Sequence, residues 1–206
     1  MDKESIVLGS GDLYCTDFEG TDKELPADAE IEKEENRLGH IKGGASVEYT
    51  PSFYEAKDDM GKVSKVIITE EEALLKSGIM TWCGLTLEKL CQTARVTEKD
   101  GKRTVKIGGI ANATGKKYLL RFVHKDTEDG DIRVTIVGNN QAGFTIAFAK
   151  DSETVIDAEF KAQPMDKEGT LILYEEDMDV TDGGTTSGDV TDGGTTSGDD
   201  TNTEGE

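Results

Sequence analysis

The stretch Ala45-Ser-Val-Glu-Tyr-Thr-Pro-Ser-Phe53 decides the fold class of this 206-residue chain. Val47, Tyr49 and Phe53 share one face of an extended strand, while Glu48 and its polar neighbours occupy the other face. The turn signal Asp58-Asp-Met-Gly61 follows, and further extended-type residues come after it. The pattern predicts an extended hairpin of two long strands, at about residues 45–57 and 62–69.

The same alternation of apolar and polar residues recurs in the second half of the chain. It is found in the segments 118–122, 132–136, 144–149 and 156–160. Turns rich in Asp and Gly separate these segments. Eight or so half-buried antiparallel strands predict a mainly β (α+β) fold, either a β-sandwich or a small barrel, with one flanking helix.

The flanking helix is predicted from a spacing of apolar residues near the middle of the chain. Leu87, Leu90, Cys91 and Ala94 fall at i, i+3, i+4 and i+7, and Thr86 is placed to cap the N-terminus. These positions form one apolar helix face that can pack on a sheet.

Two further segments have a less regular pattern. Residues 67–82 are compatible with bent strands or with a short helix, because Thr69-Glu-Glu-Glu72 has the form of a capping box. Residues 19–36 are rich in Asp and Glu and contain Pro26, which predicts an exposed excursion rather than a core element.

The C-terminal residues consist of a repeat that is too polar to fold. The ten residues 179–188 recur unchanged at 189–198, and each copy carries a single Val. The chain therefore divides into a folded domain, residues 1–176, and a disordered acidic tail, residues 177–206. Of the net charge of −20, the segment from Glu175 onward contributes −11, because it holds eleven Asp and Glu and no Lys or Arg.

Charge and cysteine content limit the classes of function. An acidic surface repels phosphate, which argues against gripping nucleic acid but is compatible with a wall along which nucleic acid moves. The three cysteines are odd in number and form no Cys-x-x-Cys pair, so we expect buried, reduced thiols. The sequence has no secretion signal and no apolar run near the ~18 residues of a membrane span, which predicts a soluble protein made in the cytosol.

The sequence offers few residues for catalysis or metal binding. His40 and His124 lack the neighbours of ligands or general bases, and no Cys/His spacing fits zinc. The string Ala113-Thr-Gly-Lys-Lys117 lacks the earlier glycine and the Ser/Thr of a phosphate loop. We therefore expect no catalytic residue, no metal, no cofactor and no enzymatic activity.

Several strings together resemble the tail tube proteins of long-tailed (siphovirus-type) phages and prophages of Gram-positive bacteria. The resemblance covers roughly residues 5–176 and depends on the order and spacing of four segments: Gly39–Pro51, Lys76–Leu90, Lys106–Gly109 and Val155–Gly169, the last leading into Leu171–Glu175.

The resemblance implies a structural virion protein whose copies form hexameric rings that stack into a tube. Long hairpins of neighbouring subunits would join into one barrel around a lumen through which DNA passes without adhering. The implied partners are further copies of the chain, the tape-measure protein, the tail terminator and distal tail or baseplate proteins, with no membrane. The implied location is the virion tail, after assembly in the bacterial cytoplasm.

Carried onto this chain, the resemblance assigns the hairpin 45–69 and the strands within 131–149 to the barrel, and the segment 19–36 to contacts between rings or subunits. The tail is expected outside the tube as a soluble brush. The candidate interface residues are Tyr49, Phe53, Lys57, Asp58, Asp59, Lys62, Lys65, Ile67 and Val134.

Two alternatives remain open at this level. One is the inner tube of a contractile tail or of a phage-tail-like bacteriocin, which has the same fold. The other is a monomeric β-sandwich module that binds carbohydrate or a cell surface. Such modules present clustered exposed aromatic residues, whereas Trp82 is the sole tryptophan and its apolar neighbours predict burial.

Overall fold

The computed structural model describes residues 6–21, 23–62 and 64–177. Eight strands form the main sheet: β1 (Asp12–Asp17), β2 (Arg37–Gly39), β3 (Ile41–Lys57), β4 (Ser64–Ile79), β7 (Tyr118–His124), β8 (Ile132–Asn140), β9 (Ile156–Gln163) and β10 (Leu173–Glu176). A separate two-stranded sheet is formed by β5 (Arg95–Lys99) and β6 (Lys102–Lys106). The helical elements are α1 (Asp28–Ile31), α2 (Gly84–Leu90) and two 3-10 turns, η1 (Glu34–Asn36) and η2 (Ile110–Asn112). Apart from Asp177, the predicted acidic tail lies outside the described residues.

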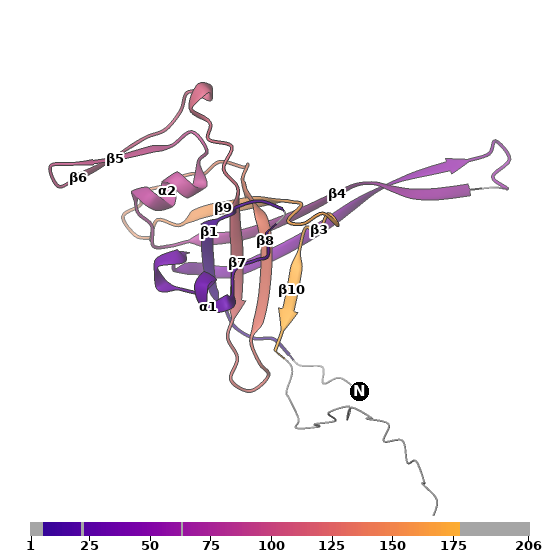
Figure 1. Cartoon of the computed structure of the whole chain (residues 1–206), viewed down its shortest axis with the longest axis horizontal. Helices are drawn as coiled ribbons and strands as arrows, with labels where there is room; N and C mark the ends of the chain where they lie inside the picture. Colours follow the sequence, from indigo (N-terminus) through magenta and orange to yellow (C-terminus); the bar gives the residue numbers. More distant parts are fainter. Residues whose placement is uncertain (1–5, 22, 63, 178–206) are drawn as a thin grey trace, which may run out of the picture.

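The main sheet is antiparallel throughout, in the order β2-β1-β7-β8-β9-β4-β3. Two strands pair with the same edge of β8: β10 pairs with Ile132–Thr135, and β9 pairs with Val137–Asn140. At this division the sheet bends, and β3, β4 and β9 cross behind β1, β7 and β8 in the view of Figure 1. The prediction of a mainly β, antiparallel fold is confirmed.

The principal core lies between these two halves of the bent sheet. Leu13, Leu120 and Ile136 approach it from β1, β7 and β8, and Leu75 and Phe160 approach it from β4 and β9. All five side chains are fully buried, and α2 closes one end of the cluster through Leu87 and Leu90. Burial of this apolar surface is the main source of folding free energy.

The other face of β7 is covered as well, which corrects the prediction of a half-buried strand. Leu119 and Val123 belong to a second cluster with Tyr14 and Ile31. Ile31 comes from the acidic segment 19–36, and none of its surface is exposed. The prediction of an exposed excursion holds for most of the described residues in this segment, but the buried Ile31 anchors α1 to the sheet.

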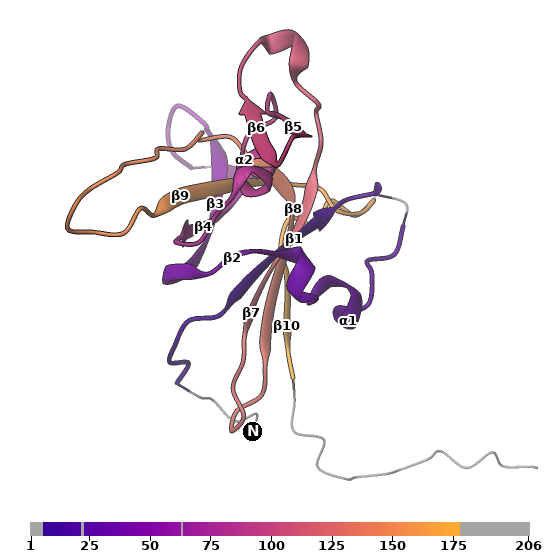
Figure 2. The same ribbon diagram turned by 90° about the vertical axis from the view of Figure 1, so that its left-hand side faces the viewer.

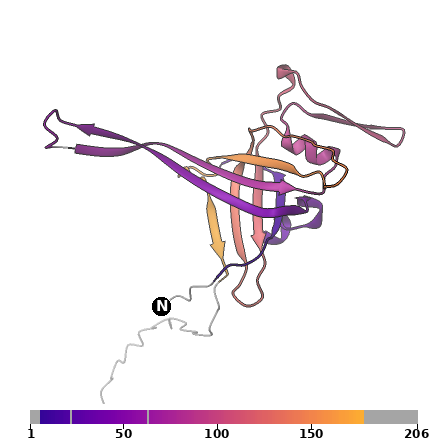
Figure 3. The same cartoon turned by 180° about the vertical axis from the view of Figure 1, so that it is seen from behind.

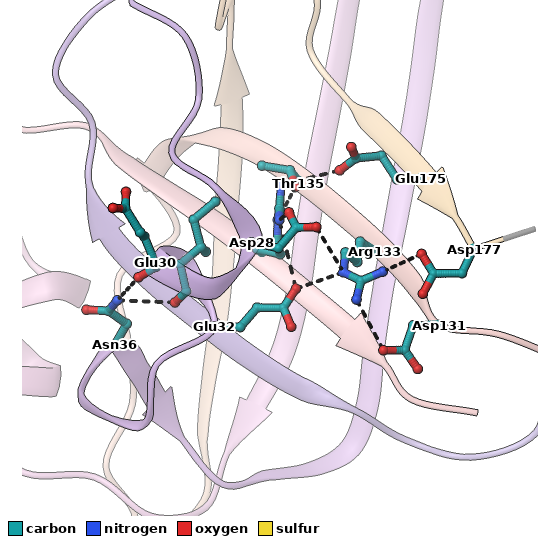
Figure 4. A network of polar contacts seen from close by, with 11 residues as sticks. Asp28, Glu30, Glu32, Asn36, Asp131, Arg133, Thr135, Glu175 and Asp177 are labelled. Atoms are coloured by element: carbon teal, nitrogen blue, oxygen red, sulfur yellow. Dashed lines mark hydrogen bonds and ion pairs between the residues drawn. The ribbon is translucent and has the colours of Figure 1, made fainter. Parts of the chain in front are cut away.

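Two arginines complete the attachment of α1 (Figure 4). The side chain of Arg121, 2% exposed, donates hydrogen bonds to Thr135 Oγ1 at 2.8 Å and to Asp28. Arg133 lies beside it and donates to Glu32 at 2.8 Å and to Asp177 at 2.8 Å.

These contacts join the N-terminal segment to the end of the described chain. Burial lowers the pKa of Arg133, but the hydrogen bonds that it donates to Glu32 and Asp177 outweigh this effect and raise that pKa overall. Two carboxylates of the acidic segment, Asp28 and Glu32, are thus partners of Arg121 and Arg133.

The flanking helix is shorter and begins earlier than predicted. It spans Gly84–Leu90 with Cys83 as its N-cap, so Thr86 lies at the third helical position rather than at the cap. The Thr86 hydroxyl accepts a hydrogen bond from the Cys83 backbone N–H at 3.2 Å. Cys91 and Ala94 lie beyond the helix, although Ala94 is buried. A second short helix, α1, was not predicted.

The undecided segment 67–82 is strand as far as Ile79. The box-like Thr69-Glu-Glu-Glu72 caps no helix, because it lies within the extended strand β4, where Glu70, Glu71 and Glu72 pair with β3. The predicted strand 144–149 is wrong, since no strand is assigned within residues 141–155. Phe144 and Ile146 still pack against the core, whereas Phe148 is 82% exposed. Alternation selects the buried side chains, but a strand also needs an open backbone edge to pair with.

The hairpin arm as a candidate assembly surface

The hairpin of β3 and β4 extends far beyond the rest of the molecule (Figure 3). β3 has 17 residues and ends the sheet order, so among the described strands only β4 pairs with it. β9 pairs with β4 only at Leu74–Ile79. Beyond Ala73 the hairpin therefore has two open backbone edges within the described structure. We call this projecting part, residues 49–62 and 64–72, the arm.

The arm carries large apolar side chains that nothing in the described chain covers. Phe53 and Tyr54 are each 59% exposed, and Ile67 is 47% exposed. Met60, Val66 and Ile68 are exposed as well. Soluble monomers seldom present so many apolar side chains on one projecting element, and such patches mark sites of association.

A β-bulge places these residues on both faces of the arm. Ser52 pairs with Glu70, but Phe53 pairs with Ile68, which leaves Thr69 as an extra residue. The Thr69 hydroxyl donates a hydrogen bond to the Ser52 carbonyl at 3.2 Å and so holds the bulge.

Residues that pair across antiparallel strands share a face. Phe53 and Ile68 therefore lie on one face, and Tyr54 and Ile67 lie on the other. The outer arm therefore exposes large apolar side chains on both of its faces.

The base of the hairpin has one buried and one polar face. Ala73, Leu75 and Ile79 point into the core. On the opposite face, Lys76 Nζ lies 2.8 Å from a Glu48 oxygen and 3.3 Å from a Glu159 oxygen. The hydrogen bond that Lys76 donates to Glu48 raises the pKa of Lys76.

This ion-pair ladder continues along the same face. Lys161 Nζ lies 2.7 Å from a Glu72 oxygen. Glu70 and Asp157 occupy the same face by register, because Glu70 pairs with Ser52 and Asp157 with Gly78. The face formed by β3, β4 and β9 is therefore polar and predominantly anionic.

The structure gathers eight of the nine predicted interface residues on the arm. Tyr49, Phe53 and Ile67 are exposed along its length, and Tyr49 donates its hydroxyl to Glu71, which raises the pKa of Tyr49. The charged set Lys57, Asp58, Asp59, Lys62 and Lys65 lies at the distal end. Val134 lies elsewhere, half-buried within β8 between its cross-strand partners Phe122 and Tyr174.

Sequence reasoning missed Tyr54, Val66 and Ile68 as candidates. The consecutive run Val66-Ile67-Ile68 was the available signal, because a strand that is apolar at successive positions is apolar on both faces.

The reactive side chains elsewhere form no cluster with the arm. In the described ranges, no three His, Cys, Asp or Glu side chains are placed to hold a metal ion. The buried His124 shares a hydrogen bond of 2.8 Å with the Ser10 carbonyl through Nδ1, and Cys83 is exposed rather than buried as predicted. None of the helices in the described residues is both long and apolar enough to span a membrane.

Comparison with known proteins finds no family model and no curated protein that matches this chain. Its function is therefore argued from the residues and their geometry.

Proposed function

We propose that this chain is the tail tube protein of a long-tailed phage or prophage, and that its copies associate through the arm into rings that stack as a tube. The observation that carries the proposal is the arm itself: two open strand edges and two apolar faces on an element that projects from an otherwise well-packed domain. The resemblance of residues 5–176 to tail tube proteins supports the same conclusion.

Ring closure accounts for the open edges. A long exposed edge strand pairs indiscriminately with other chains unless it is covered. When each copy adds its hairpin to the edge of the next by the same rotation, every edge is satisfied in a closed ring. Hairpins joined in this way form a barrel wall, which has no edge. The proposed hexamer is the ring size that the resemblance implies.

In such a ring, the two faces of the hairpin base would have separate roles. The face with Ala73 and Leu75 is committed to the core of its own subunit, so the opposite face is the one available to line a lumen. That face carries Glu48, Glu72 and Glu159, partly balanced by lysines. A net anionic wall repels phosphate, so DNA would pass along it without adhering.

The outer arm suits contacts with other copies rather than the lumen. Its apolar residues on both faces would lose their exposure to water only when clamped between neighbouring subunits. Burial of a large apolar side chain stabilises by about 1.5–3 kcal/mol relative to full exposure, so half-exposed residues such as Phe53 and Ile67 contribute about half of that each. The proposed tube implies the tape-measure, terminator and baseplate proteins as partners. It also implies a location in the virion tail.

The proposal is tested by the state of the purified full chain. Size-exclusion chromatography with light scattering and negative-stain microscopy, over a range of protein concentrations, should show rings or tubes rather than a 22.3 kDa monomer. A monomer that persists independently of concentration would contradict the proposal. It would favour a monomeric binding module, in which the exposed Phe148 beside the half-buried Trp82, with ring centroids 6.5 Å apart, offers an aromatic surface.

A further inference from the structure

Positive charge in this acidic chain is concentrated in one segment. Residues 89–117 contain eight of the 23 Lys and Arg but only two of the 43 Asp and Glu, a net charge of +6 in a chain of −20. The eight cations are Lys89, Arg95, Lys99, Lys102, Arg103, Lys106, Lys116 and Lys117. Five of them lie on the β5–β6 hairpin, which stands apart from the main sheet (Figure 2).

The strand register places four of these cations on a single face of that hairpin. Arg95 pairs with Lys106 and Lys99 pairs with Lys102, with two threonines between the pairs. All four are exposed, and none of them takes part in an ion pair within the described residues. Like charges directly opposite each other weaken a two-stranded sheet. We call residues 95, 99, 102 and 106 the basic face.

The other face of the hairpin is held by the domain. Val105 packs against the principal core, and Arg103 donates a 2.6 Å hydrogen bond to Glu98. Gly84, which opens α2, lies so close that a Cβ there would come within 2.8 Å of both Val105 and Arg103. The hairpin is therefore fixed on α2 by one face, and its basic face is left for an anionic partner.

The opposite end of the molecule is acidic. The β7–β8 turn, residues 125–131, and residues 175–177 contain seven Asp and Glu and one Lys, a net charge of −6. Arg133 binds Asp131 and Asp177, whereas Glu128 and Glu176 are exposed to solvent. The β5–β6 hairpin and this turn lie beyond opposite ends of the β7–β8 strand pair (Figures 1 and 2). We call residues 125–131 and 175–177 the acidic end.

We propose that the basic face binds the acidic end of a second copy of this chain, in the next ring of the stack; this inference rests on the proposed function. Complementary charges at opposite ends of one molecule make a heterologous, head-to-tail contact, which repeats without closing and produces an open stack. Nucleic acid is the less favoured partner, because a chain of net charge −20 repels a polyanion at long range.

Charge reversal on the full-length chain tests this contact. Lys99→Glu/Lys102→Glu should still form rings, but stacking of rings into tubes at about 50 mM salt should require a roughly tenfold higher protein concentration. Glu128→Lys/Glu176→Lys should weaken stacking in the same way. A variant that carries both reversals should recover tube length, because each inverted basic face meets an inverted acidic end. Lys116→Glu/Lys117→Glu makes the same charge change outside the basic face and should stack normally.

The outcomes separate this inference from the proposed function. Absence of rings in the wild-type protein would contradict the proposed function itself. Normal tubes from Lys99→Glu/Lys102→Glu, or no recovery in the fourfold variant, would overturn only the stacking contact. Circular dichroism checks folding, and Lys99→Gln/Lys102→Gln repeats the test without introducing acids. Binding of a short DNA duplex that these variants lose, with tube length unchanged, would assign the basic face to nucleic acid instead.

Discussion

At the scale of single residues, buried ionisable groups determine how stability responds to pH. Cys15 lies on β1 in the principal core, fully buried, and burial raises the pKa of its thiol from 9.0 to about 12. The unfolded chain therefore ionises Cys15 at lower pH than the folded chain does. The contribution of the neutral thiol to the free energy of unfolding is fully present below about pH 9. It is lost as the pH rises toward 12.

We therefore predict that unfolding becomes easier in alkali because of Cys15. By linkage, this residue alone lowers the free energy of unfolding by about 2–3 kcal/mol between pH 8 and pH 11. Urea titrations at both pH values measure the difference. Cys15→Ala should lower stability at pH 8 but show a smaller further loss in alkali. An equal alkaline loss in both proteins would exclude Cys15 as the cause. Tyr118, whose pKa burial also raises to about 12, supplies part of the remaining pH dependence.

Arg121 is the second residue whose replacement should be costly. Its buried guanidinium donates hydrogen bonds to Asp28, to Glu175 and to the hydroxyl of the fully buried Thr135. Arg121→Leu should lower the free energy of unfolding by about 2–4 kcal/mol, because Thr135 loses its partner and α1 loses an anchor. Chemical denaturation measures the change.

A matched substitution distinguishes a buried from an exposed guanidinium. Arg95→Leu removes an exposed arginine of β5 and should change stability by no more than about 0.5 kcal/mol. Equal effects of the two substitutions would show that the Arg121 network does not hold α1.

At the scale of elements, the arm combines open edges with apolar faces. We predict that Ile67→Asp leaves the fold intact and abolishes ring formation, because the new carboxylate lies on a face that must be buried in the assembly. Light scattering and circular dichroism together measure the two effects. Leu85→Asp is the matched control: Leu85 is 44% exposed against 47% for Ile67, but it lies on α2, away from the arm. Loss of assembly in both variants would mean that the arm has no special role.

Val134 provides a contrast within the same sheet. It is half-buried between β7 and β10, on the side of β8 that faces the principal core. Val134→Asp should therefore lower the melting temperature of the isolated subunit, whereas Ile67→Asp should not. Differential scanning calorimetry of dilute protein separates the two classes. An unchanged melting temperature for Val134→Asp would place this residue at a surface after all.

The sequence predicted well those elements in which the local pattern of apolar residues matches the burial of side chains in the folded structure. The base of β4 and β9 alternate in burial, and Ile156 and Phe160 are buried as their spacing predicted. The failures have identifiable physical causes. β7 is buried on both faces because Ile31, the last residue of α1, packs against it. α1 lies far from β7 in the sequence, so the apolar pattern of β7 alone does not indicate that this helix covers it.

The candidate site was predicted in part for a related reason. The long hairpin could be predicted from its alternation, and so could Phe53 and Ile67 as its exposed apolar residues. The Thr69 bulge could not, because it depends on the register between two strands, and it is the bulge that places Tyr54 and Ile67 together on the second face. Segment 144–149 has the alternation of a strand but pairs with no strand of the described chain, which pattern alone cannot reveal.

At the scale of the whole molecule, charge is distributed unevenly along the chain, which bears on the proposed assembly. Residues 178–206 carry eight Asp and Glu and no Lys or Arg, so removing them changes the net charge from −20 to −12. Like-charged copies repel one another, and this repulsion is strongest at low ionic strength. Asp177, just before this segment, belongs to the folded domain because it binds Arg133.

We therefore predict that a chain ending at Asp177 still forms rings and tubes, at an equal or lower protein concentration than the full-length chain when salt is low. Sedimentation and electron microscopy of both proteins across salt concentrations measure the threshold. A chain ending at Ile172 is the control, because it also lacks β10 and with it the carboxylates that hold Arg121 and Arg133; it should fail to fold stably. If the chain ending at Asp177 folded but no longer assembled, the acidic repeats would be part of the interface, and the arm would not be sufficient for association.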